Sequence, residues 1–343
     1  MTTEKQRQPK FFYLIPGQTN QRLDGESRWQ HVKRLLLRGK RQLPSGGVRI
    51  IYQHCEMLNR NGYHAYPVHL GNFTVDWFEH RISELTENEF LSMVTGDDIL
   101  ICPEIIPAAA VNYAPRSKVG FVQNWALVEK GTGLGKSYED FGFTSILVCS
   151  NYLKNYMEQC SKLPIDEVVN GIDLQLFHAD SRERKPGSVL YLNRRNVEDA
   201  REAIKLLPSN LAAEADFIEL ENKYSQRELA AHYRRADIFL AIGYPEGFSL
   251  PPLEAMACGC AVAGFTGGGG LEHMEHEKTA LIAPDGDVGA LSNCLQRLLT
   301  DHRLKEKIRN EGMNRAQQFS LSHMEDELLG FARTMVLSEK TSP

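Results

Sequence analysis

Short apolar runs separated by helix-like stretches occur along the first half of the chain. Each run has the length and composition of a buried parallel strand. The predicted strands are Phe11 to Pro16, Tyr63 to Leu70, Asp98 to Cys102, Lys118 to Gln123 and Ser145 to Ser150. Residues 46–60 and 151–160 are predicted to be helices, and Asn61-Gly62 supplies a stop signal for the first of them.

The same alternation continues in the second half. Strands are predicted at Ser188 to Asn193, Asp216 to Leu220, Asp237 to Ile242 and Cys260 to Phe265. Helices are predicted at Asp199 to Leu207, Gln226 to Arg235, Pro252 to Gly259 and Ser322 to Leu337. A regular alternation of this kind favours an α/β fold with parallel sheets covered by helices on both faces. Because 343 residues exceed what one core usually supports, two domains are expected, with the boundary near residues 168–173.

The turn between the strand ending at Ile242 and the next helix has the features of a phosphate site. Pro252 suits the first position of a helix, where its missing N–H is not needed. The residues just before it therefore lie where free N–H groups and the positive end of the helix dipole favour an anion. These donor-binding candidates are Gly247, Phe248, Ser249 and Leu250.

Two carboxylates and a second glycine-rich turn complete this region. Glu254 falls in the first turn of the predicted helix and can accept hydrogen bonds from ribose hydroxyls. Glu246 lies at the entrance of the turn, where it can bind hexose hydroxyls. After the next strand, Gly267 and Gly268 let the backbone approach a diphosphate closely. An ordinary strand–turn–helix with two solvated glutamates is the plainer alternative.

The run Glu246-Gly-Phe-Ser-Leu-Pro-Pro-Leu-Glu254-Ala-Met-Ala-Cys-Gly resembles the E-x7-E signature of glycosyltransferase family 4. The Gly-Gly pair followed by Glu272 also matches that family. The resemblance implies a GT-B fold, in which two Rossmann-like domains face a central cleft, and a retaining enzyme that uses a nucleotide-sugar. It further implies that residues 170–321 bind the donor and that residues 1–169, completed by a C-terminal helix at 322–343, bind the acceptor.

Cationic side chains are predicted to stabilise the leaving diphosphate, because the chain has no Asp-x-Asp pair beside a strand end. The resemblance points to Arg194 and Arg195, and a solvated strand end is the alternative for this pair. Relatives place a lysine several residues later, whereas this chain has none there, so Arg201 is either its replacement or a surface residue. Glu246 would orient the hexose. No metal and no cofactor are predicted.

Acceptor-side residues match the family less well. Gly46 and Gly47 resemble its glycine-rich acceptor loop. Gln123 and Trp125 stand where many relatives carry a histidine, and Trp125 is predicted either to stack on a sugar or to belong to the core. A basic amphipathic stretch, Trp29 to Leu43, is either a peripheral contact with anionic lipid or a solvated helix.

Composition excludes several classes of protein. A net charge of −5 argues against bulk attraction to nucleic acid. Seven scattered cysteines favour a reducing compartment. With no signal peptide or apolar run of membrane-spanning length, we expect a cytoplasmic protein, at the inner membrane face if the basic stretch binds lipid. The near P-loop at Gly131 to Ser137 and the pair His273 and His276 are interpreted as a mobile loop and solvated histidines.

These features predict a retaining, metal-independent hexosyltransferase that moves a hexose from a nucleotide-diphosphate sugar to a glycan or lipid-linked acceptor in polysaccharide or glycoconjugate synthesis. Uridine diphosphate glucose is the expected donor, on its frequency within the family. A nucleotide-sugar epimerase of the same fold and a non-catalytic nucleotide-sugar-binding module are the alternatives. A phosphorylase would need a longer chain and a pyridoxal cofactor.

Overall fold

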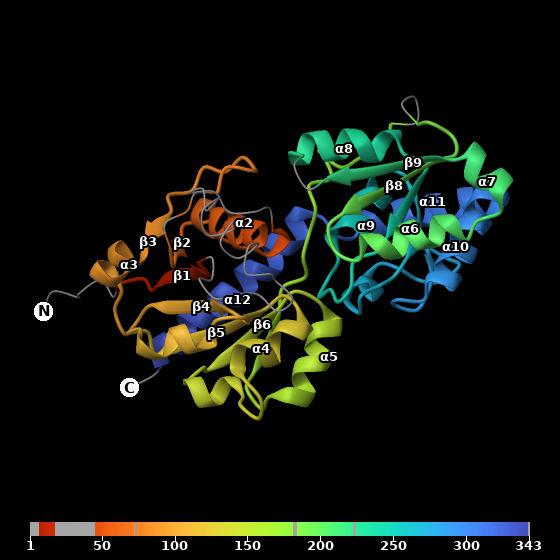
Figure 1. Cartoon of the computed structure of the whole chain (residues 1–343). Coiled ribbons are helices and arrows are strands. Elements are labelled where there is room, and N and C mark those ends of the chain that lie inside the picture. Colours follow the sequence, from red (N-terminus) through yellow and green to blue (C-terminus); the bar gives the residue numbers. More distant parts are fainter. Residues whose placement is uncertain are drawn as a thin grey trace, which may run out of the picture. The chain divides into compact units, whose positions relative to one another are not determined.

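The structure is a computed structural model that describes residues 7–17, 45–71, 73, 75–180, 184–221 and 224–341 (Figure 1). The basic stretch at residues 29–43 therefore lies outside the described residues. Contacts divide the chain into two compact units. The first comprises residues 1–121, 129–146 and 332–343, and the second comprises residues 122–128 and 147–331. The domain limits predicted from the sequence stay a prediction.

The first sheet has seven strands in the order β3-β2-β1-β4-β5-β6-β7. Their bounds are β1 Lys10–Ile15, β2 His64–His69, β3 Leu85–Thr86, β4 Ile99–Pro103, β5 Ser117–Val122, β6 Ser145–Val148 and β7 Ile165–Glu167. Strand β1 lies between β2 and β4, and both pairings are parallel. Because β1 is covered on both faces, it is a continuous apolar run rather than an alternating one.

Helices follow the strands of this sheet. They are α2 Gly46–Arg60, α3 Glu87–Met93, α4 Val128–Thr132 and α5 Asn151–Cys160, with 3-10 turns η1 Pro107–Asn112, η2 Trp125–Leu127 and η3 Tyr138–Phe141. Helices α2 and α5 have the bounds predicted from the sequence. Helix α2 ends because Asn61 leaves the helical region and Gly62 adopts a φ of 82°.

The second sheet has five parallel strands in the order β12-β11-β10-β8-β9. They are β8 Ser188–Asn193, β9 Asp216–Glu221, β10 Ile238–Ala241, β11 Ala261–Gly264 and β12 Leu281–Ile282. The helices are α6 Val197–Lys205, α7 Ser209–Glu214, α8 Gln226–Arg235, α9 Leu250–Ala257, α10 Val288–Thr300, α11 His302–Ala316 and α12 Leu321–Thr341, with the 3-10 turn η4 Gly269–Glu272. The predicted α/β class with parallel sheets is confirmed.

A buried ion network fixes the start of β10. Asp237, at 3% exposure, accepts a hydrogen bond from Lys305 Nζ at 2.7 Å and pairs with Arg309, and both cations come from α11. Its carboxylate also accepts the backbone N–H of Gly187 at 2.9 Å. Burial alone would raise the pKa of Asp237, but these hydrogen bonds and the two positive charges lower it below its ordinary value.

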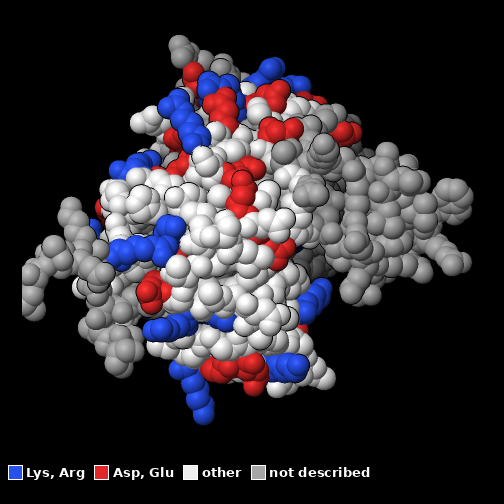
Figure 2. Space-filling model, turned by 90° about the vertical axis from the view of Figure 1, so that its left-hand side faces the viewer, with Lys and Arg blue, Asp and Glu red and all other residues white. Residues whose placement is uncertain are grey.

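Among the described residues, none of the helices combines the length and the hydropathy that a membrane crossing requires. On the face of the molecule shown in Figure 2, described basic and acidic side chains are interspersed with wide uncharged areas. Among its described side chains, that face therefore has no extended patch of charges of one sign.

Candidate functional site

The candidate site lies where the strand order of the second sheet reverses. The chain leaves β8 toward β9 on one side and returns to β10 on the other, so β8 has β9 and β10 as its two neighbours. Ligands of open parallel sheets bind beyond the carboxyl ends of strands at such a point. This topology brings Arg194 and Arg195, just after β8, beside the turn that follows β10.

A pocket opens at this reversal. Predicted site residues Arg194, Arg195, Glu246 and Ser249 line it. The rest of the wall comes from the end of β8, from β10 and its continuation to Gly243, and from the proline pair at positions 251 and 252. The structure thus gathers the predicted cations and one of the two carboxylates around one hollow.

Glu246 and Arg195 form an ion pair in this pocket. Arg195 Nη1 lies 3.6 Å from Glu246 Oε1, and the two side chains are 47% and 26% exposed. The same guanidinium nitrogen donates a hydrogen bond to the carbonyl of Pro245 at 2.8 Å. Burial raises the pKa of the Glu246 carboxyl, and the charges of Arg195 and Arg194 oppose that rise. The hydroxyl groups of a ligand would donate hydrogen bonds to this carboxylate and so replace the water that burial removes from it.

Helix α9 begins two residues earlier than predicted. Its first residue is Leu250, so the prolines occupy its second and third positions and Glu254 lies in the second turn, not the first. The error has a physical cause: proline is tolerated throughout the first turn, because the N–H groups there have no partner within the helix. With no N–H on Pro251 or Pro252, the amides offered at this helix start are those of Ser249 and Leu250.

Glu254 is almost fully enclosed, with 2% of its surface exposed. The residue takes part in an interaction within the protein. Ser249, at the N-cap of α9, adopts a φ of 65°, which is uncommon for a residue other than glycine. A strained residue at the mouth of a pocket is typical of functional loops.

The glycine turn after β11 is tied directly to the Glu246 loop. Glu246 N–H donates to Gly267 O at 2.8 Å, and Gly269 N–H donates to Glu246 O at 3.0 Å. A Cβ added at Gly269 would lie 2.0 Å from the carbonyl carbon of Gly247. Gly267 and Gly268 have φ values of 61° and 89°. Only glycines allow the two backbones to come this close in these conformations.

The predicted acceptor-side residues lie in two places. Gly46 and Gly47 begin α2 in the first unit. Gln123 and Trp125 belong to the second unit, where the Trp125 indole N–H donates to Gly267 O at 3.2 Å. A Cβ on Gly247 would lie 2.0 Å from Gln123 O. Their role toward an acceptor stays a prediction.

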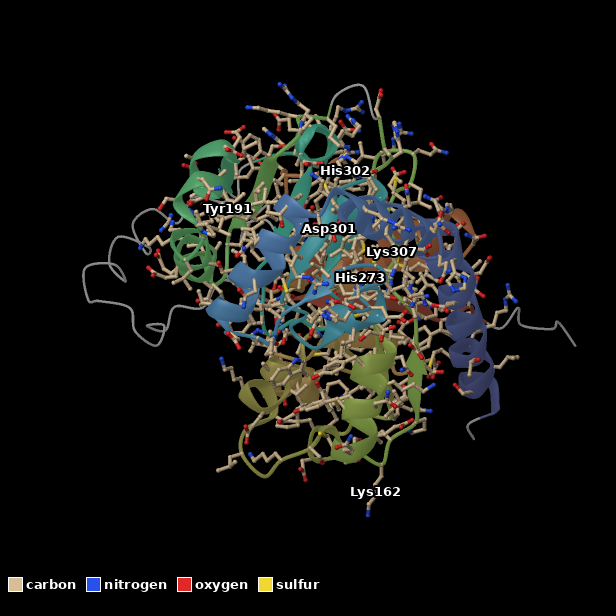
Figure 3. All side chains as sticks on the ribbon, turned by 90° about the vertical axis from the view of Figure 1, so that its right-hand side faces the viewer. Lys162, Tyr191, His273, Asp301, His302 and Lys307 are labelled. Carbon is tan, nitrogen blue, oxygen red and sulfur yellow. The ribbon has the colours of Figure 1, made fainter. Side chains whose placement is uncertain are left out.

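Arg201 is engaged elsewhere in the second unit. Its guanidinium donates to Glu219 through Nε at 3.1 Å and Nη2 at 2.7 Å, and to Glu198 at 2.5 Å. Glu219 also accepts hydrogen bonds from Tyr191, labelled in Figure 3, and from Asn193. Glu198 on α6 and Glu219 on β9 thus hold this guanidinium, and its role as a replacement for the lysine stays a prediction.

Three polar residues at the site were not predicted from the sequence. Asn196, with a φ of 57°, donates to the carbonyls of Ile242 at 3.3 Å and Tyr244 at 2.8 Å. Asn124 donates to Pro245 O at 3.0 Å, and Asp285 accepts from Gly267 N–H at 3.1 Å. An asparagine just before a helix is a turn signal, but its partner 46 or 48 residues away is not encoded locally.

The histidine pair and the near P-loop both have structural roles outside the pocket. His273, predicted to be solvated, is buried at 1% exposure between the rings of Phe248 and Phe319, and burial lowers its pKa to about 3 (Figure 3). The prediction is wrong for His273, because a glycine-rich flank looks like a surface loop, whereas His276 is exposed as expected. The segment Gly131 to Ser137 joins α4 to η3, and Ser137 caps η3 with Asp140. Within the described residues, His, Cys, Asp and Glu nowhere gather in a group of three suited to a metal ion.

Part of the second unit is similar in sequence to known glycosyltransferases. Residues 197–301 match the family model described as glycosyl transferases group 1. A D-inositol 3-phosphate glycosyltransferase of Stackebrandtia nassauensis is 30% identical over 137 residues, which cover 39% of this chain and 31% of that relative. This chain spans no more than about a third of the length of the curated relatives with that name.

Two solved structures share the fold over nearly the whole chain. Sucrose-phosphate synthase from Thermosynechococcus elongatus aligns with a TM-score of 0.69 at 16% identity, covering 97% of this chain and all of that one. HepE of Anabaena in complex with UDP-glucose aligns with a TM-score of 0.68 at 13% identity, covering 95% and 99%. The predicted GT-B fold is confirmed.

Proposed function

We propose that this chain, whose residues 197–301 match the family model described as glycosyl transferases group 1, moves a hexose from a nucleotide-diphosphate sugar to an acceptor hydroxyl. One observation carries the proposal. An arginine pair, a carboxylate and the start of a helix converge on one pocket at the strand-order reversal of the second sheet. That combination is suited to a ligand with an anionic diphosphate and a hydroxyl-rich sugar.

The chemical problem is the charge that develops as the glycosidic C–O bond to phosphate breaks. Negative charge accumulates on the leaving diphosphate, and preorganised donors stabilise it best. Arg194 and Arg195 supply cationic donors, and the amides of Ser249 and Leu250 supply neutral ones at the positive end of α9. The diphosphate would lie against these groups and the glycine turn.

The two carboxylates serve different parts of the donor. Glu246 lines the pocket and would orient the hexose through its hydroxyls. Glu254, buried on α9, would accept hydrogen bonds from the ribose hydroxyls. Transfer with retention would proceed on one face of the sugar. The acceptor oxygen forms the new bond to the anomeric carbon while a donor phosphate oxygen takes its proton.

UDP-glucose is the proposed donor. Support comes from the fold shared with HepE, whose structure was solved with UDP-glucose. A glycan or lipid-linked alcohol is the proposed acceptor class. The relatives named D-inositol 3-phosphate glycosyltransferases add a phosphorylated polyol as a third acceptor to test.

The test combines binding and turnover. Thermal shifts should first be measured with UDP-, GDP- and ADP-sugars, because a ligand that binds only the folded state raises the melting temperature. The selected donor, labelled in its sugar, is then incubated with and without acceptors. Label transferred to an acceptor supports the proposal. Epimerised sugar without an acceptor, or binding with no turnover on any acceptor class, would replace it with an epimerase or a binding module.

A further inference from the structure

A short segment, residues 122–128, packs on the two loops that form the candidate site. Although β5 ends in it, its contacts place it in the second unit. Three consecutive residues touch the loops. Gln123 O lies against Gly247, Asn124 donates to Pro245 O, and Trp125 donates to Gly267 O.

The Asn124 side chain is fixed at both ends. Its Oδ1 accepts the backbone N–H of Ala126 at 3.0 Å, which orients the amide so that Nδ2 points at Pro245 O, 3.0 Å away. The residue is 7% exposed. Arg195 donates to the same carbonyl at 2.8 Å, so that oxygen accepts two side-chain donors.

The Trp125 indole acts on the other end of the same peptide unit. Gly267 O accepts the indole N–H at 3.2 Å and the Glu246 N–H at 2.8 Å. The peptide unit that joins Pro245 to Glu246 is thus held through its C=O by Asn124 and through its N–H by a carbonyl that Trp125 fixes. A peptide plane held at both ends limits the directions in which the Glu246 side chain can leave the backbone.

We propose that Asn124 and Trp125 are positioning residues that hold the Glu246 peptide, so that its carboxylate faces the donor pocket. The proposal rests on the proposed function for its catalytic consequence, but its structural part is independent of it. It differs from a role for Trp125 in stacking on an acceptor sugar, because the indole N–H carries the effect and the ring face does not.

Two conservative variants test this. Trp125→Phe keeps an aromatic ring and removes the N–H, and Asn124→Asp keeps the acceptor toward Ala126 while removing the donor to Pro245. Trp77→Phe is a matched control, because Trp77 Nε1 is buried and has no hydrogen-bond partner among the residues that the structure describes. Asn155→Asp, at an exposed position on α5, is the second control.

The first readout is amide hydrogen exchange of peptides covering residues 244–250 in the free protein. Loss of one hydrogen bond should speed exchange of Glu246 about fivefold in each test variant, and the controls should match the wild type. Unchanged exchange in both test variants, at melting temperatures near the wild-type value, would overturn the proposal. This holds even if the wild type transfers no sugar, an outcome that would refute only the proposed function.

The second readout is steady-state transfer. We expect kcat to fall about fivefold to tenfold in Trp125→Phe, with the acceptor KM unchanged. An acceptor-stacking role predicts the reverse pattern: Trp125→Phe would retain kcat, and only Trp125→Ala would raise the acceptor KM. That pattern would overturn the proposal in favour of an acceptor platform.

Discussion

Replacing Asp237 by asparagine should strongly destabilise the second unit. Asp237 directly precedes β10, and Glu246 lies in the turn that follows this strand. The Asp237 carboxylate is 4% exposed and lies between Lys305 and Arg309. The asparagine amide can accept from only one of these cations. If the amide oxygen stays toward Arg309, the NH2 group faces both Lys305 Nζ and the Gly187 N–H, which are donors themselves, and in the flipped orientation it faces Arg309 Nη2. Lys305 and Arg309 would lose the buried carboxylate that they share, and Arg309 would keep its ion pair with Glu306.

Removing one partner of a buried ion pair costs about 3–5 kcal/mol. For a unit of this size, that corresponds to a fall of about 6–20 °C in melting temperature. Differential scanning calorimetry near pH 7 measures this fall in melting temperature. Asp216→Asn is the matched control, because Asp216 pairs with Lys185 at 2.8 Å but both side chains are exposed, at 45% and 64%. That pair should be worth about 0–1 kcal/mol.

The pH dependence follows from the lowered pKa of Asp237. A carboxyl whose folded pKa lies below its unfolded value stabilises the fold above the unfolded pKa, near pH 4, and loses that contribution as the pH falls through the folded pKa. The difference in stability between wild type and Asp237→Asn should therefore narrow below about pH 4. If Asp237→Asn and Asp216→Asn lower the free energy of unfolding by the same amount at pH 7, the buried ion network does not stabilise the start of β10.

Three further predictions concern the site itself. Burial raises the pKa of Glu246 and so disfavours its ionised form in the folded protein, which means that Glu246→Gln should raise the melting temperature above pH 6. The same variant should lower kcat at least tenfold, because it loses the carboxylate proposed to orient the hexose. Wild-type turnover in Glu246→Gln would show that Glu246 has no part in the mechanism. In Gly269→Ala the added Cβ would lie 2.0 Å from the Gly247 carbonyl carbon, so this variant should push the two loops apart and abolish donor-induced thermal shifts. Gly330→Ala should leave these shifts unchanged, because its Cβ would meet none of the described atoms within 4 Å. Transfer should persist in excess EDTA, and activity lost to EDTA and restored by Mg²⁺ or Mn²⁺ would contradict stabilisation by arginine alone.

Local pattern was sufficient for much of the fold. Helix α2 begins at Gly46 and ends at Arg60 as predicted, and β8 has its predicted bounds, because caps and apolar runs are encoded nearby. Helix α11 was not predicted. Its sequence is polar, and among the residues it buries are Lys305 and Arg309. Their burial depends on Asp237, about 70 residues earlier, which no helical periodicity reveals.

The candidate site was predictable only where its residues are close in sequence. The E-x7-E spacing located Glu246 beside the pocket because strand, turn and helix are contiguous there. The contacts of Trp125 with Gly267 and of Asn124 with Pro245 span 142 and 121 residues. They depend on how the second unit packs, so Trp125 was assigned only by analogy. The hydrogen bond from Arg201 to Glu219, 18 residues later, was likewise not indicated by the sequence.

The most direct test of the central claim is a calorimetric titration with nucleoside diphosphates and with the matching nucleosides. In the wild type, one diphosphate should bind at least tenfold more tightly than its nucleoside, because the arginines and the start of α9 receive the phosphates. In Arg195→Met that ratio should fall about tenfold, with little change in the affinity for the nucleoside. Equal ratios in the two proteins, or no binding of any diphosphate to the wild type, would contradict a diphosphate site at this pocket.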